Sequence, residues 1–331
     1  MKRTILLTGA GGVAIPFLIT SLRNKGYRVL TADMDGQAAG LFIADKSFVI
    51  PAGASLEFLP ALRSICLREN VDVFIPLVDE ELVAAIELER DGINVILPNI
   101  EFVKTCLDKY ALMQSLYRAG ISVPKTYLLH DAFDYTSCVF PMIIKPRVGR
   151  GSRGVCKVNS QEEIEKYLKN THYTSESLLL QEYILGPEYT VSVVVWRDGN
   201  VQAVIPKEII SKRGITRLAV TRYNKLIEDL CILVQEKLHA DGPFNVQLCL
   251  DDNGQPYIFE INPRFSTSVT LTMAAGIDEV GLLVDQAISG TIPTHKLAWK
   301  EGVVLMRSSQ DTFVDHGDFI MAQKQIIDCT L

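Results

Sequence analysis

The stretch at 244–269, FNVQLCLDDNGQPYIFEINPRFSTSV, decides the fold of this chain. Two apolar runs flank an Asp-Asn-Gly turn at 252–254, and this pattern predicts a β-hairpin. Side chains two residues apart point to the same side of a strand, so Glu260, Asn262 and Arg264 are expected on one face. Buried charge is costly unless it is paired or bound to a metal. The pattern therefore indicates a functional site on this face.

Oxygen ligands for a metal gather around the same hairpin. Gln247 lies on the first strand, across the turn from Glu260 and Asn262. Hard oxygen ligands with few carboxylates suit Mg²⁺, because phosphates and water can complete its coordination. Arg264 could clamp a phosphate or an acyl oxygen. The alternative is a charged edge strand, in which Asn262 and Pro263 only begin a turn.

A second candidate site lies at 143–155, IIKPRVGRGSRGV. Lys145 ends a predicted strand and can place a positive charge on a phosphate. Glycines leave the backbone free to approach an anion and let the loop move as a lid. The loop holds three glycines and a hydroxyl residue, Gly149, Gly151, Ser152 and Gly154. The pattern is not a P-loop, and the alternative is a solvated basic loop between two strands.

The N-terminal turn TGAGGVA, at 8–14, follows a predicted strand. Gly9, Gly11 and Ala14 fit the G-x-G-x-x-G/A spacing, and Asp33 ends the next predicted strand. Dinucleotide binding is one interpretation. A tight strand-to-helix turn that binds no nucleotide is the other, and the residues alone leave both open.

Alternating short strands and helices over the first hundred residues predict a parallel sheet with helices on both faces. One helix is expected over 80–92 and another, unbroken, over 99–120. An α+β region follows, with a capped helix after Ser160, a hairpin across RDGN and a C-terminal strand in VVLMRSS. The fold class is therefore α/β followed by α+β.

Composition restricts the function classes. The 331 residues are 48% hydrophobic, which is enough for two or three cores. The net charge of −6 argues against a surface that coats nucleic acid. Seven cysteines without a C-x-x-C pair indicate reduced thiols and a cytoplasmic protein. No uninterrupted apolar run of about 18 residues occurs, so no membrane span is predicted.

Together these segments resemble the ATP-grasp superfamily, and most strongly one synthetase unit of the carbamoyl-phosphate synthase large subunit. The resemblance covers nearly the whole chain. Its most specific part is the N-V-Q … E-[MI]-N-P-R pattern in 245–264, followed by a Ser/Thr-rich stretch. QEYILGPEYTV at 181–191 looks like the adenine-binding hinge, and IIKP before the Gly-rich loop looks like the phosphate lid.

The resemblance implies a two-lobed ATP-grasp fold behind a Rossmann-like domain that binds no dinucleotide. It implies a leading domain over 1–107 and a small lobe with the lid over 108–184. A large lobe with the metal site and the C-terminal strand would then follow over 185–331.

The resemblance also implies residue roles. Lys109 and Lys145 would meet the ATP phosphates, and Lys145 and Arg264 would act at the reacting phosphate. Adenine would be read by the hinge, and Glu188 would hold the ribose hydroxyls. The hinge consists of Gln181, Glu182, Tyr183 and Ile184. Mg²⁺, or alternatively Mn²⁺, would be held by Gln247, Glu260 and Asn262, although many relatives carry an acid in place of Gln247.

The implied activity is an ATP- and Mg²⁺-dependent ligase that activates a carboxylate as an acyl phosphate and joins it to an amine. Its partners would be small-molecule substrates and a second copy of the chain in a homodimer, with no nucleic acid and no membrane. One alternative is a carbamoyl-phosphate-synthase-like enzyme, or half of a split synthase, acting on bicarbonate or carbamate. A second is a non-catalytic ATP-binding regulatory protein. An NAD-dependent dehydrogenase is the most distant alternative.

Substrate selectivity leaves few traces in the sequence. The acidic turn Asp79-Glu80-Glu81 follows a predicted strand at its carboxyl end, where open sheets bind ligands, and could hold an amine. It could equally be an acid-rich helix N-terminus. Several arginines are further candidates for contacts with phosphate or acceptor, or are only solvated. They are Arg150, Arg153, Arg213, Arg217, Arg222 and Arg307.

Overall fold

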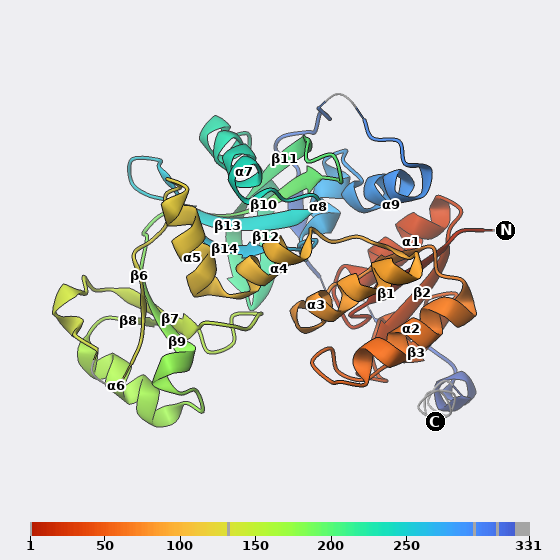
Figure 1. Ribbon diagram of the computed structural model, residues 1–331, viewed down its shortest axis with the longest axis horizontal. Helices are drawn as coiled ribbons and strands as arrows, with labels where there is room; N and C mark the ends of the chain where they lie inside the picture. Colours follow the sequence, from red (N-terminus) through yellow and green to blue (C-terminus); the bar gives the residue numbers. More distant parts are fainter. Residues whose placement is uncertain (1, 131–132, 294–295, 309–310, 322–331) are drawn as a thin grey trace.

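The computed structural model describes residues 2–130, 133–293, 296–308 and 311–321. Within these ranges the chain forms a parallel sheet of five strands and two antiparallel sheets of four and six strands. In Figure 1 the parallel sheet and the four-stranded sheet lie at opposite ends, with the six-stranded sheet between them. The mixed α/β prediction is confirmed.

The parallel sheet has the strand order β3-β2-β1-β4-β5. Its strands are buried on both faces because neighbouring side chains enter different cores. Ile5 and Leu7 pack with helix α1, whereas Leu6 packs with helices α2 and α3. The strands are β1 (Thr4–Thr8), β2 (Arg28–Asp33), β3 (Lys46–Val49), β4 (Val73–Ile75) and β5 (Asn94–Val95); the helices are α1 (Ile15–Asn24), α2 (Phe58–Glu69) and α3 (Leu82–Ala85).

The predicted helix over 80–92 is much shorter than expected. Only α3 is α-helical, and 3₁₀ turns at Asp79–Glu81 and Ile86–Asp91 flank it. The first turn is tight because the Glu81 carboxylate folds back and accepts hydrogen bonds from the backbone N–H groups of Leu77 and Val78, at 3.0 and 3.1 Å. This interaction holds the acidic turn against the end of β4.

The four-stranded sheet has the order β6-β9-β7-β8 and carries helix α6. As predicted, Ser160 caps α6, and its Oγ accepts a hydrogen bond from Glu163 N at 3.4 Å. The Gly-rich segment 147–155 is the loop between β7 and β8. The elements are β6 (Thr126–Leu128), β7 (Met142–Pro146), β8 (Cys156–Val158), β9 (Leu178–Glu182) and α6 (Gln161–Asn170).

The six-stranded sheet has the order β14-β13-β10-β11-β12-β15, and each neighbouring pair is antiparallel. Both predicted hairpins and the C-terminal strand are confirmed, whereas β12, α8 and α9 were not predicted. The strands are β10 (Glu188–Val195), β11 (Val201–Arg213), β12 (Ile215–Thr221), β13 (Phe244–Leu250), β14 (Pro256–Asn262) and β15 (Val304–Met306); the helices are α7 (Lys225–Leu238), α8 (Val269–Ala274) and α9 (Glu279–Ser289).

The unbroken helix predicted over 99–120 is wrong. Two helices, α4 (Ile100–Leu107) and α5 (Lys109–Arg118), meet at Asp108, whose backbone is extended. The Asp108 carboxylate accepts from Tyr110 N and Ala111 N, which caps α5. It also pairs with Arg147 at 2.7 Å, so the Gly-rich loop is anchored at this break.

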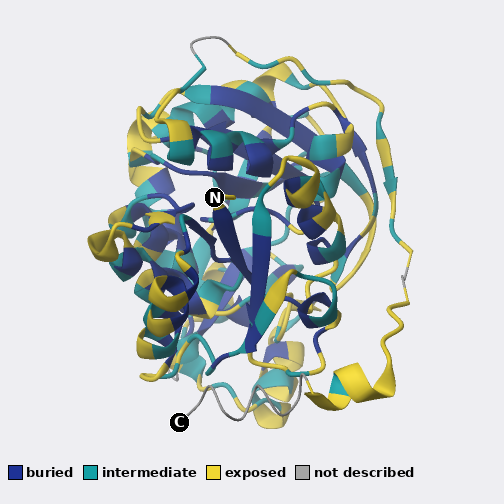
Figure 2. Ribbon diagram, turned by 90° about the vertical axis from the view of Figure 1, so that its right-hand side faces the viewer, coloured by how far each residue is buried: buried dark blue, intermediate teal, exposed yellow. Residues whose placement is uncertain are grey.

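Buried residues concentrate in the strands and exposed ones in the outer helices and loops (Figure 2). One apolar core joins the parallel sheet to the six-stranded sheet, since Ile5 of β1, Val194 of β10 and Leu283 of α9 belong to it. The predicted domain bounds at 107/108 and 184/185 remain predictions. The shared core nevertheless fixes the N-terminal layer against the large sheet.

Candidate active site

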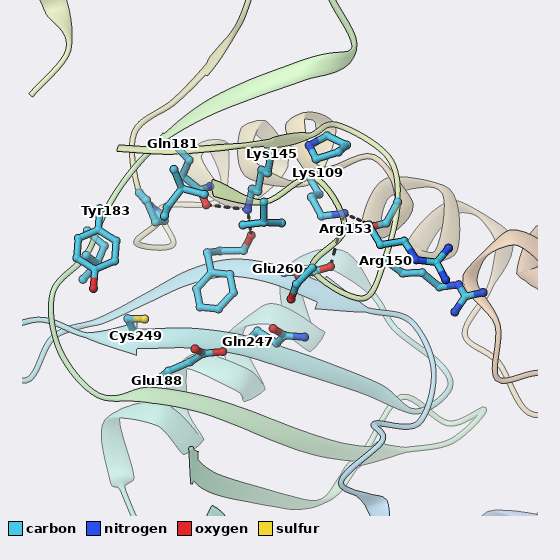
Figure 3. A pocket seen from close by; sticks show the side chains of 18 of the residues that line it. Lys109, Lys145, Arg150, Arg153, Gln181, Tyr183, Glu188, Gln247, Cys249 and Glu260 are labelled. Carbon is cyan, nitrogen blue, oxygen red and sulfur yellow. Dashed lines mark hydrogen bonds and ion pairs between the residues drawn. The ribbon is translucent and has the colours of Figure 1, made fainter. Parts of the chain in front are cut away.

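A cavity of about 190 Å³ lies between the four-stranded and the six-stranded sheets, under the Gly-rich loop (Figure 3). We call it the first cavity. It brings together twelve predicted site residues from seven separate segments: Lys109, Lys145, Gly149, Gly151, Ser152, Gln181, Glu182, Tyr183, Ile184, Glu188, Gln247 and Glu260. Arg150 and Arg153 of the loop also line it.

Lys145 and Lys109 are both buried in the first cavity, and Lys145 is the more deeply buried, with 4% of its surface exposed. Its Nζ donates to Gln181 Oε1 at 2.8 Å and to the carbonyl oxygen of Phe259 at 3.2 Å. Burial lowers the pKa of Lys145 to about 8, against the opposing attraction of Glu260 and with a further lowering by Lys109. Its two acceptors are neutral, so this ammonium is well placed to gain from an anion.

Lys109, the first residue of α5, connects the loop to the β14 strand. Its Nζ donates to the carbonyl oxygen of Gly149 at 2.5 Å and lies 3.6 Å from Glu260 Oε1. Figure 3 shows Lys109 and Lys145 converging on the same side of Glu260. A single carboxylate therefore faces two lysines, which leaves the pocket electropositive.

A β-bulge at Phe259 breaks the alternation along β14, although the register after the bulge still pairs Glu260 and Asn262 with Gln247 and Asn245, which are two residues apart on β13. Gln247 of β13 pairs with Glu260, while the next residue, Leu248, pairs with Ile258. Phe259 is the extra residue, and such a bulge re-aims side chains. Phe259 and Glu260 consequently both line the cavity, while Ile258 is buried in the opposite core.

Three predicted site residues do not line the first cavity. Asn262 is buried at the end of β14, opposite Asn245 of β13. Gly154 packs at the base of the loop, where its carbonyl oxygen accepts a hydrogen bond from Tyr167 Oη at 2.7 Å. Arg264 lies beyond β14 and lines a neighbouring cavity.

The hinge residues keep contacts of their own. Gln181 bridges Lys145 and Thr126, donating from Nε2 to Thr126 Oγ1 at 2.8 Å. The Lys157 ammonium lies 3.9 Å from the centre of the Tyr183 ring. The Lys157 ammonium therefore makes a cation–π contact with the Tyr183 ring at the edge of the pocket.

Lys212 and Cys249 also line the first cavity, and sequence reasoning missed them. Lys212 pairs with Glu188 at 2.5 Å. The run Ser-Lys-Arg-Gly offers two neighbouring cations, and only the register of β11 decides which one faces the pocket. The strand alternation around Cys249, two residues after Gln247, was the available signal for that residue.

A second cavity, of about 450 Å³, opens at the carboxyl ends of β1, β2, β3 and β4. Gly9, Gly11, Ala14 and Asp33 all line it. The Asp33 carboxylate accepts from Gly11 N at 2.9 Å, so this acid closes the turn between β1 and α1. Such a use favours the structural interpretation of the Gly-rich turn over dinucleotide binding.

The acidic turn after β4 is engaged within the protein. Asp79 Oδ1 lies 2.5 Å from Arg264 Nε, and Glu80 Oε2 lies 2.7 Å from Arg150 Nε. Glu81 is 3% exposed and lines the second cavity. Burial raises the pKa of Glu81 to about 7, although hydrogen bonds and the Arg264 charge act in the opposite direction.

The remaining candidate arginines line neither the first nor the second cavity. Arg222 pairs with Glu208 at 3.0 Å, and Arg307 Nη2 donates to the carbonyl oxygen of Thr267 at 2.9 Å. Arg213 and Arg217 lie on β11 and β12 and line neither cavity. The described ranges hold no cluster of three His, Cys, Asp or Glu side chains that could bind a metal unaided. They also contain no helix with the length and apolarity needed to cross a membrane.

Comparison with known proteins gives matches over both halves of the chain. The family described as ATP-grasp domain matches residues 106–268, and the family described as PylC-like, N-terminal domain matches residues 5–96. The carbamoyl phosphate synthase large chain of Pyrococcus furiosus is 27% identical over 56% of this chain and 19% of its own length. The carbamoyl-phosphate synthase of Methanobrevibacter smithii is 22% identical over 80% of this chain and 76% of its own length. The chain thus spans between about a fifth and three quarters of these relatives.

Solved structures share the fold. N5-carboxyaminoimidazole synthetase from Staphylococcus aureus, complexed with ADP, aligns with a TM-score of 0.74 and 18% identity over 90% of this chain and 81% of that one. The L-amino acid ligase from Bacillus licheniformis aligns with a TM-score of 0.70 and 18% identity over 87% of this chain and 74% of that one. At these identities the likeness concerns the fold.

Proposed function

We propose, from the premise that this chain carries an ATP-grasp domain behind a PylC-like N-terminal domain, that it is an ATP- and Mg²⁺-dependent ligase. It would activate a carboxylate as an acyl phosphate and join it to an amine, releasing ADP and phosphate. The observation that carries the proposal is the convergence of Lys145, Lys109 and Glu260 beneath the Gly-rich loop.

The first cavity supplies complementary ends for a nucleoside triphosphate. Lys109, Lys145 and the backbone of the Gly-rich loop form its positive end, where phosphates would bind. Tyr183 and Ile184 of the hinge line it together with Ile143, and these side chains suit a flat purine ring. Glu188 lies on the neighbouring strand and would accept from the ribose hydroxyls.

The residues present fit a divalent cation that is shared with phosphates. Glu260 and Gln247 are direct partners across the β13–β14 pair, and both line the first cavity. Asn262 follows two residues later on the same strand. One carboxylate and neutral oxygens leave most coordination positions to phosphate and water, as Mg²⁺ prefers. Mg²⁺ bound there would neutralise phosphate charge.

The chain's own groups suit both steps of the reaction. A carboxylate oxygen of the substrate attacks the γ-phosphorus, and the bond from that phosphorus to the oxygen of ADP breaks. Lys145 and Arg264 stabilise the negative charge on the transferred phosphoryl group. The amine nitrogen then attacks the acyl carbon, phosphate leaves, and the nitrogen loses a proton. The loop, held by Arg150 to Glu80, excludes water from the acyl phosphate.

A second candidate is phosphorylation of bicarbonate or carbamate. Two observations favour it: the neutral Gln247 at the metal position, and the likeness to proteins named carbamoyl-phosphate synthase. This reaction needs the same nucleotide site and differs only in the acceptor.

The experiment is ADP release from Mg²⁺-ATP with amino acids, dipeptides, bicarbonate and ammonia, offered singly and in pairs. Release that requires a carboxylate together with an amine supports the ligase. Release with bicarbonate alone supports the second candidate. Bound ATP without release under any condition would contradict both and leave a regulatory ATP-binding protein.

A further inference from the structure

The second cavity lies where an open parallel sheet usually binds its ligand. In the order β3-β2-β1-β4-β5, the chain runs outward in one direction from β1 and in the other from β4. The crevice outside the carboxyl ends of these two strands is the switch point at which such sheets bind ligands. The cavity opens there, and its volume of about 450 Å³ suits a small molecule.

The second cavity meets the first beneath the Gly-rich loop. Arg150 and Gly151 line both cavities. Arg264 stands in the second cavity near this junction, and its Nε and Nη1 are engaged by Asp79 and by the carbonyl oxygen of Phe265. Its Nη2 makes no hydrogen bond within the described ranges, so it can receive a carboxylate.

Glu81 offers a matching acceptor deeper in the same cavity. Its side chain is almost fully buried, and Thr8 Oγ1, Leu77 N and Val78 N all donate to one oxygen, Oε1. Among the described residues none donates to Oε2. Because Glu81 lines the cavity, this oxygen can accept from a ligand there, and an ammonium group is the natural partner for a carboxylate.

The rest of the cavity wall is largely apolar. Six of its side chains come from α1, from the loops after β4 and β14, and from the starts of α2 and β12: Ile15, Leu18, Phe58, Val78, Ile215 and Phe265. Such a wall favours a ligand with a hydrocarbon side chain, because burying it removes apolar surface from water.

We propose that the second cavity binds an apolar α-amino acid, whose ammonium group meets Glu81 and whose carboxylate meets Arg264 beside the phosphate end of the first cavity. This proposal rests on the proposed ligase activity, since the carboxylate so placed is the one to be phosphorylated. It names the substrate class that the ligase proposal leaves open.

Binding is measured by calorimetry on the full chain, with and without Mg²⁺ and a non-hydrolysable ATP analogue. The probes are leucine, 4-methylpentanoate without the amine, leucinamide without the carboxylate, and glycine without the side chain. Leucine is expected to bind at least about tenfold more tightly than each of the other three, because each lacks one of the three contacts. Equal binding of leucine and 4-methylpentanoate, or no binding of either, overturns the proposal.

Two variants locate the site. Glu81→Gln keeps a carbonyl that can accept the three hydrogen bonds on Oε1. It is expected to weaken the binding of leucine about tenfold and to leave the binding of 4-methylpentanoate unchanged. Met34→Glu, at an exposed lining residue, should weaken leucine more than glycine. Glu87→Gln, at an exposed residue outside the cavity, is the matched control. Equal weakening of leucine by Glu81→Gln and Glu87→Gln would refute the assignment.

The two proposals fail in different ways. If ADP release occurs with bicarbonate or another carboxylate while leucine neither binds nor competes, the cavity assignment is wrong and the ATP-dependent activity stands. If leucine binds as expected but no ADP is released with any amine, the ligase proposal is wrong and the amino-acid site stands.

Discussion

The Lys145 ammonium lies 3.2 Å from the main-chain carbonyl oxygen of Phe259, the residue that bulges out of the β13–β14 pairing. The bulge frees this carbonyl from the ladder and turns it toward the four-stranded sheet. One backbone oxygen thereby links the two sheets that enclose the first cavity. It also gives the buried lysine a neutral partner, so the ammonium retains its capacity to attract phosphate.

The first prediction concerns protons taken up with ATP. The pKa of Lys145 is about 8 without ligand, and phosphates should raise it by favouring the charged form. Lys145 is then partly neutral at pH 8.5 before binding and protonated afterwards, so proton uptake is expected at pH 8.5 and much less at pH 6.5. Calorimetry in two buffers of different ionisation enthalpy measures it.

Lys145→Met should remove this proton uptake and weaken the binding of ATP by about tenfold or more. Lys166→Met, at a residue of α6 outside the cavity, is the control and should retain both the proton uptake and the affinity for ATP. Uptake that persists undiminished in Lys145→Met would assign the titrating group elsewhere.

The second prediction separates charge from shape at Glu260. Glu260→Gln retains the size of the side chain but removes the carboxylate that faces Gln247 and Lys109. ADP release is expected to fall roughly 100-fold or more, because the metal loses its one charged protein ligand. The melting temperature should stay within about 3 °C of wild type, since the site is only partly buried.

Glu208→Gln is the matched control for this substitution, because Glu208 pairs with Arg222 and lines neither cavity. It should leave ADP release unchanged. Wild-type turnover in Glu260→Gln would show that the metal assignment is wrong.

The third prediction tests the ion pair between the loop and the N-terminal layer. Arg150 and Glu80 are both partly exposed, and their charged atoms lie 2.7 Å apart. Glu80→Arg and Arg150→Glu should each lower kcat/KM about two- to fivefold, as expected for a solvent-screened pair. The double reversal should restore most of the loss if the pair acts by holding the loop closed.

The outcomes of this cycle separate two roles for Arg150. If Arg150→Glu is harmful and the reversed pair does not recover, Arg150 contacts a ligand directly. If Glu80→Arg alone has no effect on kcat/KM, the pair does not hold the loop. Steady-state ADP release gives each value.

Local patterns were enough for the hairpins and for the α6 cap. The Asp-Asn-Gly and Arg-Asp-Gly-Asn turns between apolar runs specify β13–β14 and β10–β11 by themselves. The break at Asp108 was not predictable in this way. Its partner, Arg147, lies 39 residues further along the chain, and nothing near Asp108 in the sequence shows that the carboxylate is engaged.

The candidate site was predictable as a set of residues but not as an arrangement. Most of the predicted residues line the first cavity. Their identity could be predicted because each belongs to a short sequence motif that forms one strand end or one loop. The β-bulge changes which side chains of β14 point inward, and alternation alone could not anticipate it. The second cavity is built from the N-terminal sheet, the loop and the segment after β14, so it exists only once the chain has folded.

The last prediction concerns two glycines of the loop that share a backbone conformation but not an environment. Gly151 and Gly154 both have φ of +68°, a region that costs any L-residue about 1–2 kcal/mol. A Cβ at Gly154 would lie 2.6 Å from the Tyr173 ring and 3.0 Å from Pro146, whereas a Cβ at Gly151 meets nothing within 4 Å.

Gly154→Ala should therefore lose about 1–3 kcal/mol more unfolding free energy than Gly151→Ala, since overpacking adds to the backbone strain. Gly151→Ala should instead weaken the binding of ATP, because this residue lines the first cavity and its backbone is placed to approach phosphate. Urea titration of the full chain measures the first difference, and ATP calorimetry the second. Equal stability of the two variants would mean that the base of the loop is not packed against Tyr173, and that Gly154 serves the ligand rather than the fold.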